Sequence, residues 1–167
     1  MELSKFNKVL EEYQREFEKT LEKNLKEHGR VASGNLIKSI TVHSKYTNQD
    51  VTVILDSADY LKQVSEGRKP SGSGGNGQLK EKIKIWIEQK NILPRPDNLG
   101  KVPTKDQLAF LIARKIHKEG YKGSDDLSMT VDSINDKYIV KLQEALNEDI
   151  NGEAEYLINT SVGKIIF

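Results

Sequence analysis

The side chains best suited to acid–base chemistry near neutral pH are the three histidines, and they are widely separated in the sequence. His28, His43 and His117 belong to different expected elements, and none stands in the H-x-H or H-E-x-x-H spacing that would place two imidazoles on one zinc ion. The chain has no cysteine, and no serine occupies a G-x-S-x-G turn, so no motif pairs a nucleophile with a base. We therefore expect a protein that is not an enzyme.

A glycine-rich segment, residues 67–77, contains a literal match to the G-x-G-x-x-G pattern of dinucleotide-binding proteins. In that pattern the glycines follow a strand and open a helix, because the cofactor's pyrophosphate binds at the helix N-terminus. Here the polar turn at residues 66–70 leads into the glycines, and no alternation of strands and helices follows. The sequence therefore predicts a flexible loop over residues 67–77 and no cofactor.

Residues 147–152 are similar to the first half of a calcium-binding loop, with oxygen-bearing side chains at alternate positions and a glycine at the sixth. The twelfth position, where such a loop needs a bidentate glutamate, is Ile158, and the first is the neutral Asn147. The charged ligands that set calcium affinity are therefore incomplete. We expect a turn at Asn151-Gly152 that interrupts a helix, and no metal site.

A short basic strip, from Arg114 to Lys118, is the feature most typical of nucleic-acid binding, and Arg68 and Lys69 add two more cations. The whole chain, however, carries 26 basic and 25 acidic side chains, and no aromatic residues interleave with the strip to stack on bases. The favourable position of cations at the C-terminal end of a helix also accounts for the strip. Nucleic-acid binding by a basic helix face remains the alternative function.

Hydrophobic periodicity predicts the elements that position these residues. Apolar residues recur every three or four positions over residues 3–28 and predict one long amphipathic helix: Leu3, Phe6, Leu10, Tyr13, Phe17, Leu21 and Leu25. This stripe faces either the chain's own core or, at one end, a neighbouring chain. Alternating apolar residues near 40–43 and over 51–55, with a turn between them, predict an antiparallel hairpin.

The rest of the chain is predicted to be mostly helical, with helices at residues 60–64, 78–89, 104–120 and from 124 onward. Three prolines between residues 94 and 103 predict an extended connection. The expected fold class is α+β: a long N-terminal helix and further helices pack on a small antiparallel sheet, in a single domain over residues 1–167.

One core is expected for this domain, and a chain of 167 residues is long enough to bury it without disulfides. We expect Trp86 to be buried there with apolar residues of the long helix and the hairpin, namely Leu10, Phe17, Ile40, Val42, Val51, Val53 and Leu55. No run approaches the roughly 18 apolar residues of a membrane span, and no signal-peptide pattern occurs, so a cytoplasmic address without membrane contact is expected.

The final residues Ile165, Ile166 and Phe167 are apolar, where polar and frayed residues would be ordinary. We expect residues 147–167 to form a C-terminal extension. Its apolar end is then covered either by the subunit's own sheet or by a neighbouring subunit, because large exposed apolar patches usually mark interaction sites.

Four segments carry a family resemblance. Residues 33–40 read S-G-N-L-I-K-S-I, and residues 60–70 read Y-L-K-Q-V-S-E-G-R-K-P; residues 85–92 contain a tryptophan, and residues 110–120 read F-L-I-A-R-K-I-H-K-E-G. In this order they resemble the strand entry, the "E-G-R-K-P" segment and the two helices after the variable loop of the tail-completion and neck proteins of tailed bacteriophages. The resemblance spans about residues 1–146, and the rest has no counterpart.

This resemblance implies a small α+β subunit that forms a ring around the DNA channel at the head–tail junction of a virion and carries no catalysis. Its partners would be copies of itself and portal, connector or tail proteins, with DNA close by but not specifically read. Such a protein is made in the host cytoplasm and resides in the virion neck or tail. The expected interface residues come from the loop, the basic strip and the apolar end: Arg68, Lys69, Gly74, Arg114, Lys118, Ile165, Ile166 and Phe167.

Overall fold

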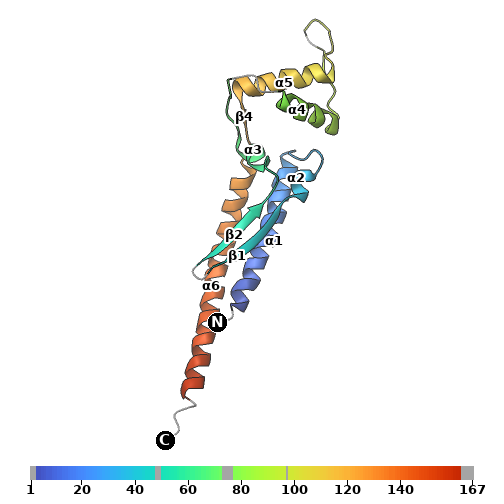
Figure 1. Cartoon of the computed structure of the whole chain (residues 1–167). Helices are drawn as coiled ribbons and strands as arrows, with labels where there is room; N and C mark the ends of the chain where they lie inside the picture. The colour runs from blue at the N-terminus through green and yellow to red at the C-terminus, as the bar shows by residue number, and fades with distance from the viewer. Residues whose placement is uncertain (1–2, 48–49, 73–76, 97, 163–167) are drawn as a thin grey trace. The chain divides into compact units, whose positions relative to one another are not determined.

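The structure is a computed structural model that describes residues 3–47, 50–72, 77–96 and 98–162, with side chains in the last range as far as Leu157. Its fold class is α+β, as the sequence predicted. The helices are α1 (Ser4–Glu27), α2 (Asn35–Lys38), α3 (Leu61–Glu66), α4 (Gln78–Gln89), α5 (Lys105–Glu119) and α6 (Asp126–Val162). The strands are β1 (Thr41–Tyr46), β2 (Val51–Asp56), β3 (Gly67–Arg68) and β4 (Tyr121–Lys122), which form two antiparallel pairs (Figure 1).

The chain divides into two compact units, and each is assembled from segments that are distant in sequence. Unit 1 comprises Met1–Lys23, Thr41–Asp56 and Ser128–Phe167, so it holds most of α1, the β1–β2 hairpin and nearly all of α6. Unit 2 comprises Asn24–Ile40 and Ser57–Leu127 and holds the remaining helices and the β3–β4 pair.

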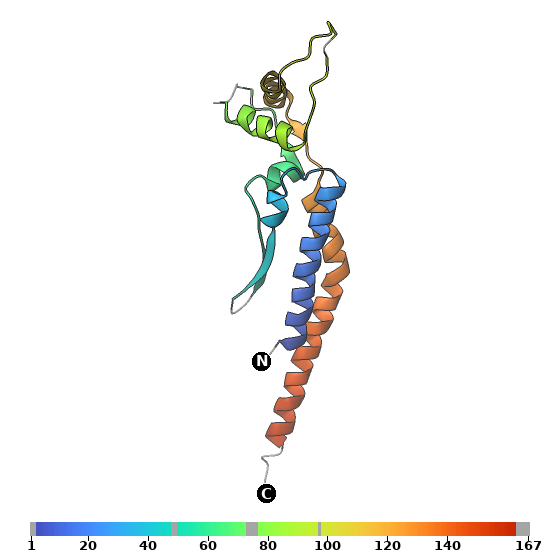
Figure 2. The same ribbon diagram turned by 90° about the vertical axis from the view of Figure 1, so that its right-hand side faces the viewer.

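In unit 1, α1 and α6 lie side by side and antiparallel (Figures 1 and 2). The middle of the predicted stripe of α1 is buried here, from Leu10 to Leu21, whereas Leu3 and Phe6 at its start are half-buried. Tyr13 is at its centre. The Tyr13 ring stacks on Phe17 with 6.2 Å between centroids and meets Tyr138 of α6 edge-on at 5.8 Å. Its hydroxyl donates to Asn135 Oδ1 at 2.9 Å. An aromatic cluster with a satisfied polar tip therefore joins the two helices.

The first turn of α1 is capped by a side chain of α6. The backbone N–H groups of Lys5 and Phe6 donate to the two carboxylate oxygens of Asp149, at 3.2 and 2.8 Å. Asp149 is buried, and α1 has no acidic residue in its own first turn. The carboxylate satisfies two of the N–H groups that every helix start leaves open, and its charge suits that end of the helix dipole. Asp149 thus fixes where α6 lies along α1.

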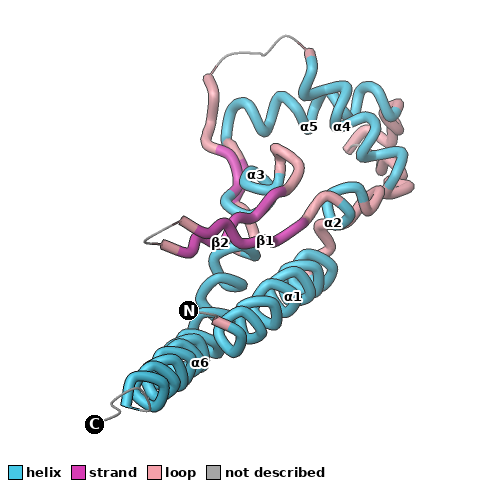
Figure 3. Tube along the Cα trace, turned by 60° about the horizontal axis from the view of Figure 1, so that its bottom comes forward, coloured by secondary structure: helices cyan, strands magenta, loops and turns pink. Residues whose placement is uncertain are grey.

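The β1–β2 hairpin forms in the predicted region and lies beside α1 (Figure 3). Its register places Val42 opposite Leu55. Val42 is buried, and its backbone N–H donates to Glu18 Oε1 of α1 at 2.7 Å. Near the hairpin tip, the Tyr46 hydroxyl donates to Asn7 Oδ1 at 2.9 Å.

The expectation that every apolar hairpin residue is buried is wrong for Val51 and Val53, which remain partly exposed. The two hydrogen bonds described above from the hairpin to α1 both start on β1. Val51 and Val53 of the second strand keep part of their surface open to solvent.

In unit 2, α4 packs against α5 through Ile87, Ala109 and Ala113, which are all buried. The small alanines let the two helix backbones approach closely. As predicted, Thr104 caps the start of α5. Its hydroxyl accepts from the Gln107 N–H, and the Gln107 side chain accepts from the Thr104 N–H. This reciprocal arrangement is a capping box, and it fixes the start of the helix.

The predicted burial of Trp86 in a core shared with Leu10 and Phe17 is wrong. Trp86 is 39% exposed and belongs to unit 2, whereas Leu10 and Phe17 are buried in unit 1. The next residue, Ile87, is the fully buried position of α4. Adjacent residues on a helix point about 100° apart, so only one of the two faces the core.

Two further expectations are corrected. Residues 67–68 do not belong to a flexible loop: they form β3, with Gly67 opposite Lys122 and Arg68 opposite Tyr121. Within the same segment, the N–H groups of Ser71 and Gly72 donate to the His117 carbonyl oxygen, and residues 73–76 lie outside the described residues. Asn151-Gly152 does not interrupt α6, since one interior glycine costs only about 1 kcal/mol and the strong helix formers Glu153, Ala154 and Glu155 follow it.

The ion pair between α1 and α6 yields a pH prediction. Lys137 Nζ lies 2.7 Å from Glu16 Oε1, and this hydrogen bond holds the pKa of Glu16 below its ordinary value of 4.5. A carboxyl whose pKa falls on folding contributes its full stabilisation at pH values above its unfolded pKa. That stabilisation is lost as the pH drops through the lower pKa of the folded state. Glu16→Gln should therefore destabilise the protein at pH 7, and its difference from wild type should shrink below about pH 4.5.

Urea unfolding of both proteins between pH 7 and pH 3 measures this difference. Glu12→Gln, an exposed position on the same helix, is the matched control. Because the pair is partly exposed, added salt should reduce the effect. A difference between wild type and Glu16→Gln that stays constant over the whole pH range would contradict the prediction.

Candidate docking surfaces

A hollow among the described residues lies in unit 2, between α5 and the connection that precedes it. It has a volume of about 620 Å³. Arg95, Lys101 and Pro103 line it from the connection, and Asp106, Phe110 and Leu111 line it from α5. We call it the α5 hollow. Three prolines keep the connection extended, as predicted, so that it forms one wall of the hollow instead of another helix.

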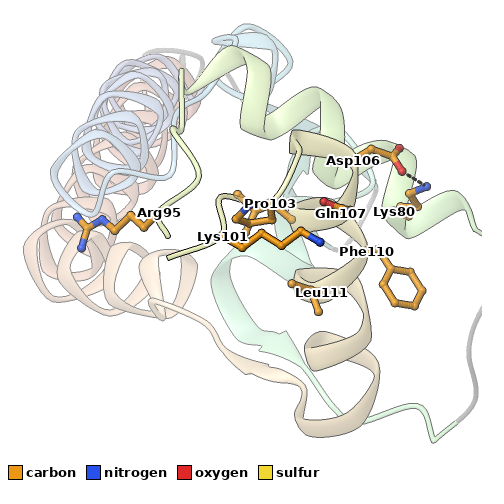
Figure 4. Close-up of a pocket in the computed structure, with 9 residues that line it drawn as sticks. Lys80, Arg95, Lys101, Pro103, Asp106, Gln107, Phe110 and Leu111 are labelled. Carbon is orange, nitrogen blue, oxygen red and sulfur yellow. Dashed lines mark ion pairs between the residues drawn. The ribbon is translucent and has the colours of Figure 1, made fainter. Parts of the chain in front are cut away.

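The charged groups of the α5 hollow are mostly cationic. At one end, Lys80 Nζ lies 2.7 Å from Asp106 Oδ2, and Lys84 Nζ lies 3.7 Å from Asp106 Oδ1 (Figure 4). The hydrogen bond to Lys80 lowers the pKa of Asp106 below its ordinary value and raises that of Lys80, so both groups are charged near neutral pH. Arg95 stands at the other end, and Lys101 lies between (Figure 4).

Two large apolar side chains of α5 line the same hollow and are exposed to solvent: Phe110 is 53% and Leu111 is 43% exposed. Leu93 and Leu99, elsewhere on the connection, are 72% and 92% exposed. Single exposed leucines are normal on a protein surface, but several gathered around a concave site indicate a binding surface. Cations beside exposed apolar side chains suit an amphipathic, acidic ligand.

A second candidate surface is on α6, in unit 1. Asp149 binds the start of α1, so the residues of α6 after Asp149 extend beyond α1 (Figures 1 and 2). We call residues 150–157 the α6 end. Tyr156 and Leu157 are 65% and 55% exposed there. No Lys, Arg or His occurs between Lys141 and Lys164, so this part of α6 is purely acidic in charge.

The predicted interface residues are only partly brought together. The backbone of Arg68 and Lys69 lies against Gly120, at the end of α5, close in sequence to the exposed Lys118. Arg114 is exposed one turn earlier on the same helix. The remaining candidates, Gly74, Ile165, Ile166 and Phe167, lie outside the described residues.

Each histidine has a local partner. His43 Nδ1 lies 3.3 Å from Asp56 Oδ2 across the hairpin, and His117 Nδ1 lies 2.6 Å from Ser71 Oγ. His28 contacts the buried Asp126, which also accepts from the Ser124 hydroxyl. In that cluster the serine binds the carboxylate and not the imidazole, which is not the order that activates a serine nucleophile. Among the described residues, no three acidic or histidine side chains gather as metal ligands.

Within the described part of the chain, no helix has the length and apolar character needed to cross a membrane. No protein-family model, curated protein or solved structure was found to match the chain.

Neither the α5 hollow nor the α6 end was identified from sequence. Two signals were present: leucines and a valine within a proline-rich connection, and a run of carboxylates without a basic residue. The sequence did not show that the connection lies beside α5. It also did not show that the start of α1 contacts α6 at Asp149, so that α6 continues beyond α1.

Proposed function

We propose that the protein is a structural subunit that forms a ring at the head–tail junction of a tailed bacteriophage and acts by protein–protein assembly around the DNA channel. The observation that carries the assembly role is the amount of apolar surface left open on both units. In unit 2 it surrounds a concave site, and in unit 1 it continues along a helix beyond its intramolecular partner. Exposed apolar surface of this kind is typical of subunits that bury it against a neighbour.

The resemblance to neck and tail-completion proteins supports the location in the virion. Its four segments correspond to α2 and the residues that lead into β1, to α3 with β3, to the second half of α4, and to most of α5. The resembling segment 60–70 ends in the β3 strand, and the segment 110–120 ends at the glycine that leads into β4, so the two segments are paired in the fold. A ring subunit needs two kinds of contact, one to its copies and one to the adjoining virion proteins. The separate surfaces of unit 1 and unit 2 suit that requirement.

Self-assembly can be tested with the purified chain. Sedimentation velocity and light scattering over a hundredfold range of concentration should show an oligomer of defined size, and negative-stain electron microscopy should show closed rings. A chain that remains monomeric throughout, both alone and with the portal and tail proteins encoded beside it, contradicts the proposal.

The virion location needs a separate test. Antibody or a fused label on the protein should mark the neck of intact phage particles, and particles made without the protein should have unjoined heads and tails. Label on capsids, or on no particle at all, contradicts the location.

The cationic residues near the end of α5 keep nucleic-acid binding as the second candidate. Binding of the chain to duplex DNA, with an affinity that falls steeply as salt rises, would favour it. Arg114→Glu would then weaken DNA binding without changing the assembly size. The ring proposal expects no such specific dependence on Arg114.

A further inference from the structure

We propose that the α6 end of one subunit docks into the α5 hollow of a second copy. This inference rests on the proposed function and specifies how the copies contact one another. Each subunit then offers one hollow and one helix end. We infer a head-to-tail contact, in which successive subunits close into a ring when the rotation between them permits.

The buried seam of α6 continues past the part of the helix that α1 covers. The seam runs through Ile134, Tyr138, Ala145 and Asp149, which are all buried against the rest of unit 1. At the same helical spacing the next seam position is Glu153, and Tyr156 follows. These positions lie beyond the first turn of α1, and Tyr156 is 65% exposed. A seam that continues beyond its partner helix presents a ready binding face to another chain.

The side chains of the α6 end and of the α5 hollow are complementary in polarity and charge. On the α6 end, Ile150, Glu153 and Leu157 share one stripe, because they are spaced by three and four residues. This apolar stripe, with a carboxylate at its centre, is complementary to the α5 hollow. The hollow has Phe110 and Leu111 in its wall, and its lining contains more cations than carboxylates. Arginine and aromatic side chains are the residue types that contribute most to protein interfaces.

The α6 end is long enough to make several contacts along one stripe. Its residues 150–157 extend about 12 Å at 1.5 Å per residue. A helix of this length lying in a groove is a recurrent mode of protein recognition, in which residues at i, i+3 and i+7 anchor the contact. Ile150, Glu153 and Leu157 have that spacing.

Charge reversal tests the electrostatic part. Glu153→Lys should raise the concentration needed for half-assembly by about tenfold or more, because it places a cation against the cations of the hollow. Glu155→Lys is the matched control: it has the same charge change on the same turn but points to the opposite side of the helix, and it should shift assembly far less. In the hollow, Arg95→Glu should weaken assembly, and Lys82→Glu, on α4 outside the lining, is its control. Combining Glu153→Lys with Arg95→Glu should restore assembly in part.

Engineered cysteines test the contact directly, since the chain has no cysteine of its own. Leu157→Cys and Leu111→Cys are made as separate variants, mixed and mildly oxidised. The mixture should give a disulfide-linked pair of chains, and each variant alone should give little. Leu157→Cys mixed with Ile85→Cys, an exposed position on α4 outside the hollow, is the control and should not link.

The outcomes separate the two proposals. Wild type that assembles, together with Glu153→Lys that assembles equally well and a cysteine mixture that does not link, overturns the docking and leaves the structural role intact. A doubly substituted chain that links within itself while the mixture fails to link places the helix end on its own hollow, which also overturns it. Wild type that never assembles overturns both.

Discussion

Gly120→Ala is expected to lower the free energy of unfolding by about 3 kcal/mol or more. A methyl group on Gly120 would lie 2.2 Å from the Arg68 carbonyl oxygen and 3.0 Å from the Pro70 nitrogen, which are backbone atoms that cannot turn aside. Its φ of 70° and ψ of −164° also belong to a region that only glycine occupies readily. Gly67, which follows the last residue of α3, has a φ of 86° and the same ψ. Gly67 is the first residue of β3, and Gly120 directly precedes β4, so both glycines lie at the β3–β4 pair.

Urea unfolding followed by tryptophan fluorescence measures the loss in unit 2, because Trp86 is the only tryptophan and belongs to that unit. Gly152→Ala is the control, since nothing lies within 4 Å of its added methyl group and its backbone is helical. That change should raise stability by about 0.5–1 kcal/mol, as for an interior helical glycine. Because Gly152 belongs to unit 1, its unfolding is followed by far-ultraviolet circular dichroism, which reports the helices of both units. Equal effects of the two substitutions would mean that the close approach of β3 and β4 does not exist.

Asp126→Ala is expected to cost about 3 kcal/mol or more, because it removes a fully buried carboxylate that serves several partners. Asp126 begins α6, contacts His28 at the far end of α1 and accepts from the Ser124 hydroxyl. The next residue along the chain also contacts α3: the Leu127 N–H donates to Ser65 Oγ at 2.8 Å. Loss of the carboxylate removes the acceptor of the half-buried Ser124 hydroxyl and the partner of His28.

Thermal and urea unfolding of three variants check this expectation. Asp126→Asn keeps the shape and part of the hydrogen bonding, so it should lose less stability than Asp126→Ala. Asp136→Ala removes an exposed carboxylate from the same helix and should change the free energy of unfolding by under about 0.5 kcal/mol. If Asp126→Ala resembled Asp136→Ala, the buried cluster would have no structural role.

Local signals in the sequence were sufficient for most elements. The spacing of apolar residues predicted α1 to within a residue or so at each end, and Thr104 with Gln107 three positions later marked the start of α5. These features depend on contacts between neighbours in the chain, so a single sequence carries them. The fold class followed from them.

Contacts between distant segments were not predictable in the same way. Asp149 was read as part of a poor calcium loop, but its oxygens bind the N–H groups of Lys5 and Phe6. Nothing near Asp149 in the sequence indicates that use. Likewise, Gly67 and Gly152 look alike as single glycines, and only the pairing of β3 with β4 shows that one is required and the other is incidental.

The discontinuous make-up of unit 1 has a consequence for the way the protein is made. Tyr13 of α1 meets Asn135 of α6, which is 122 residues farther along the chain. At about 5–20 residues per second, the ribosome needs roughly 6–24 s to supply it. During that time the apolar stripe of α1 is already outside the ribosome and has no cover from α6. Newly made chains therefore pass through a period in which they need chaperones, or in which α1 of one chain meets another on the same messenger RNA.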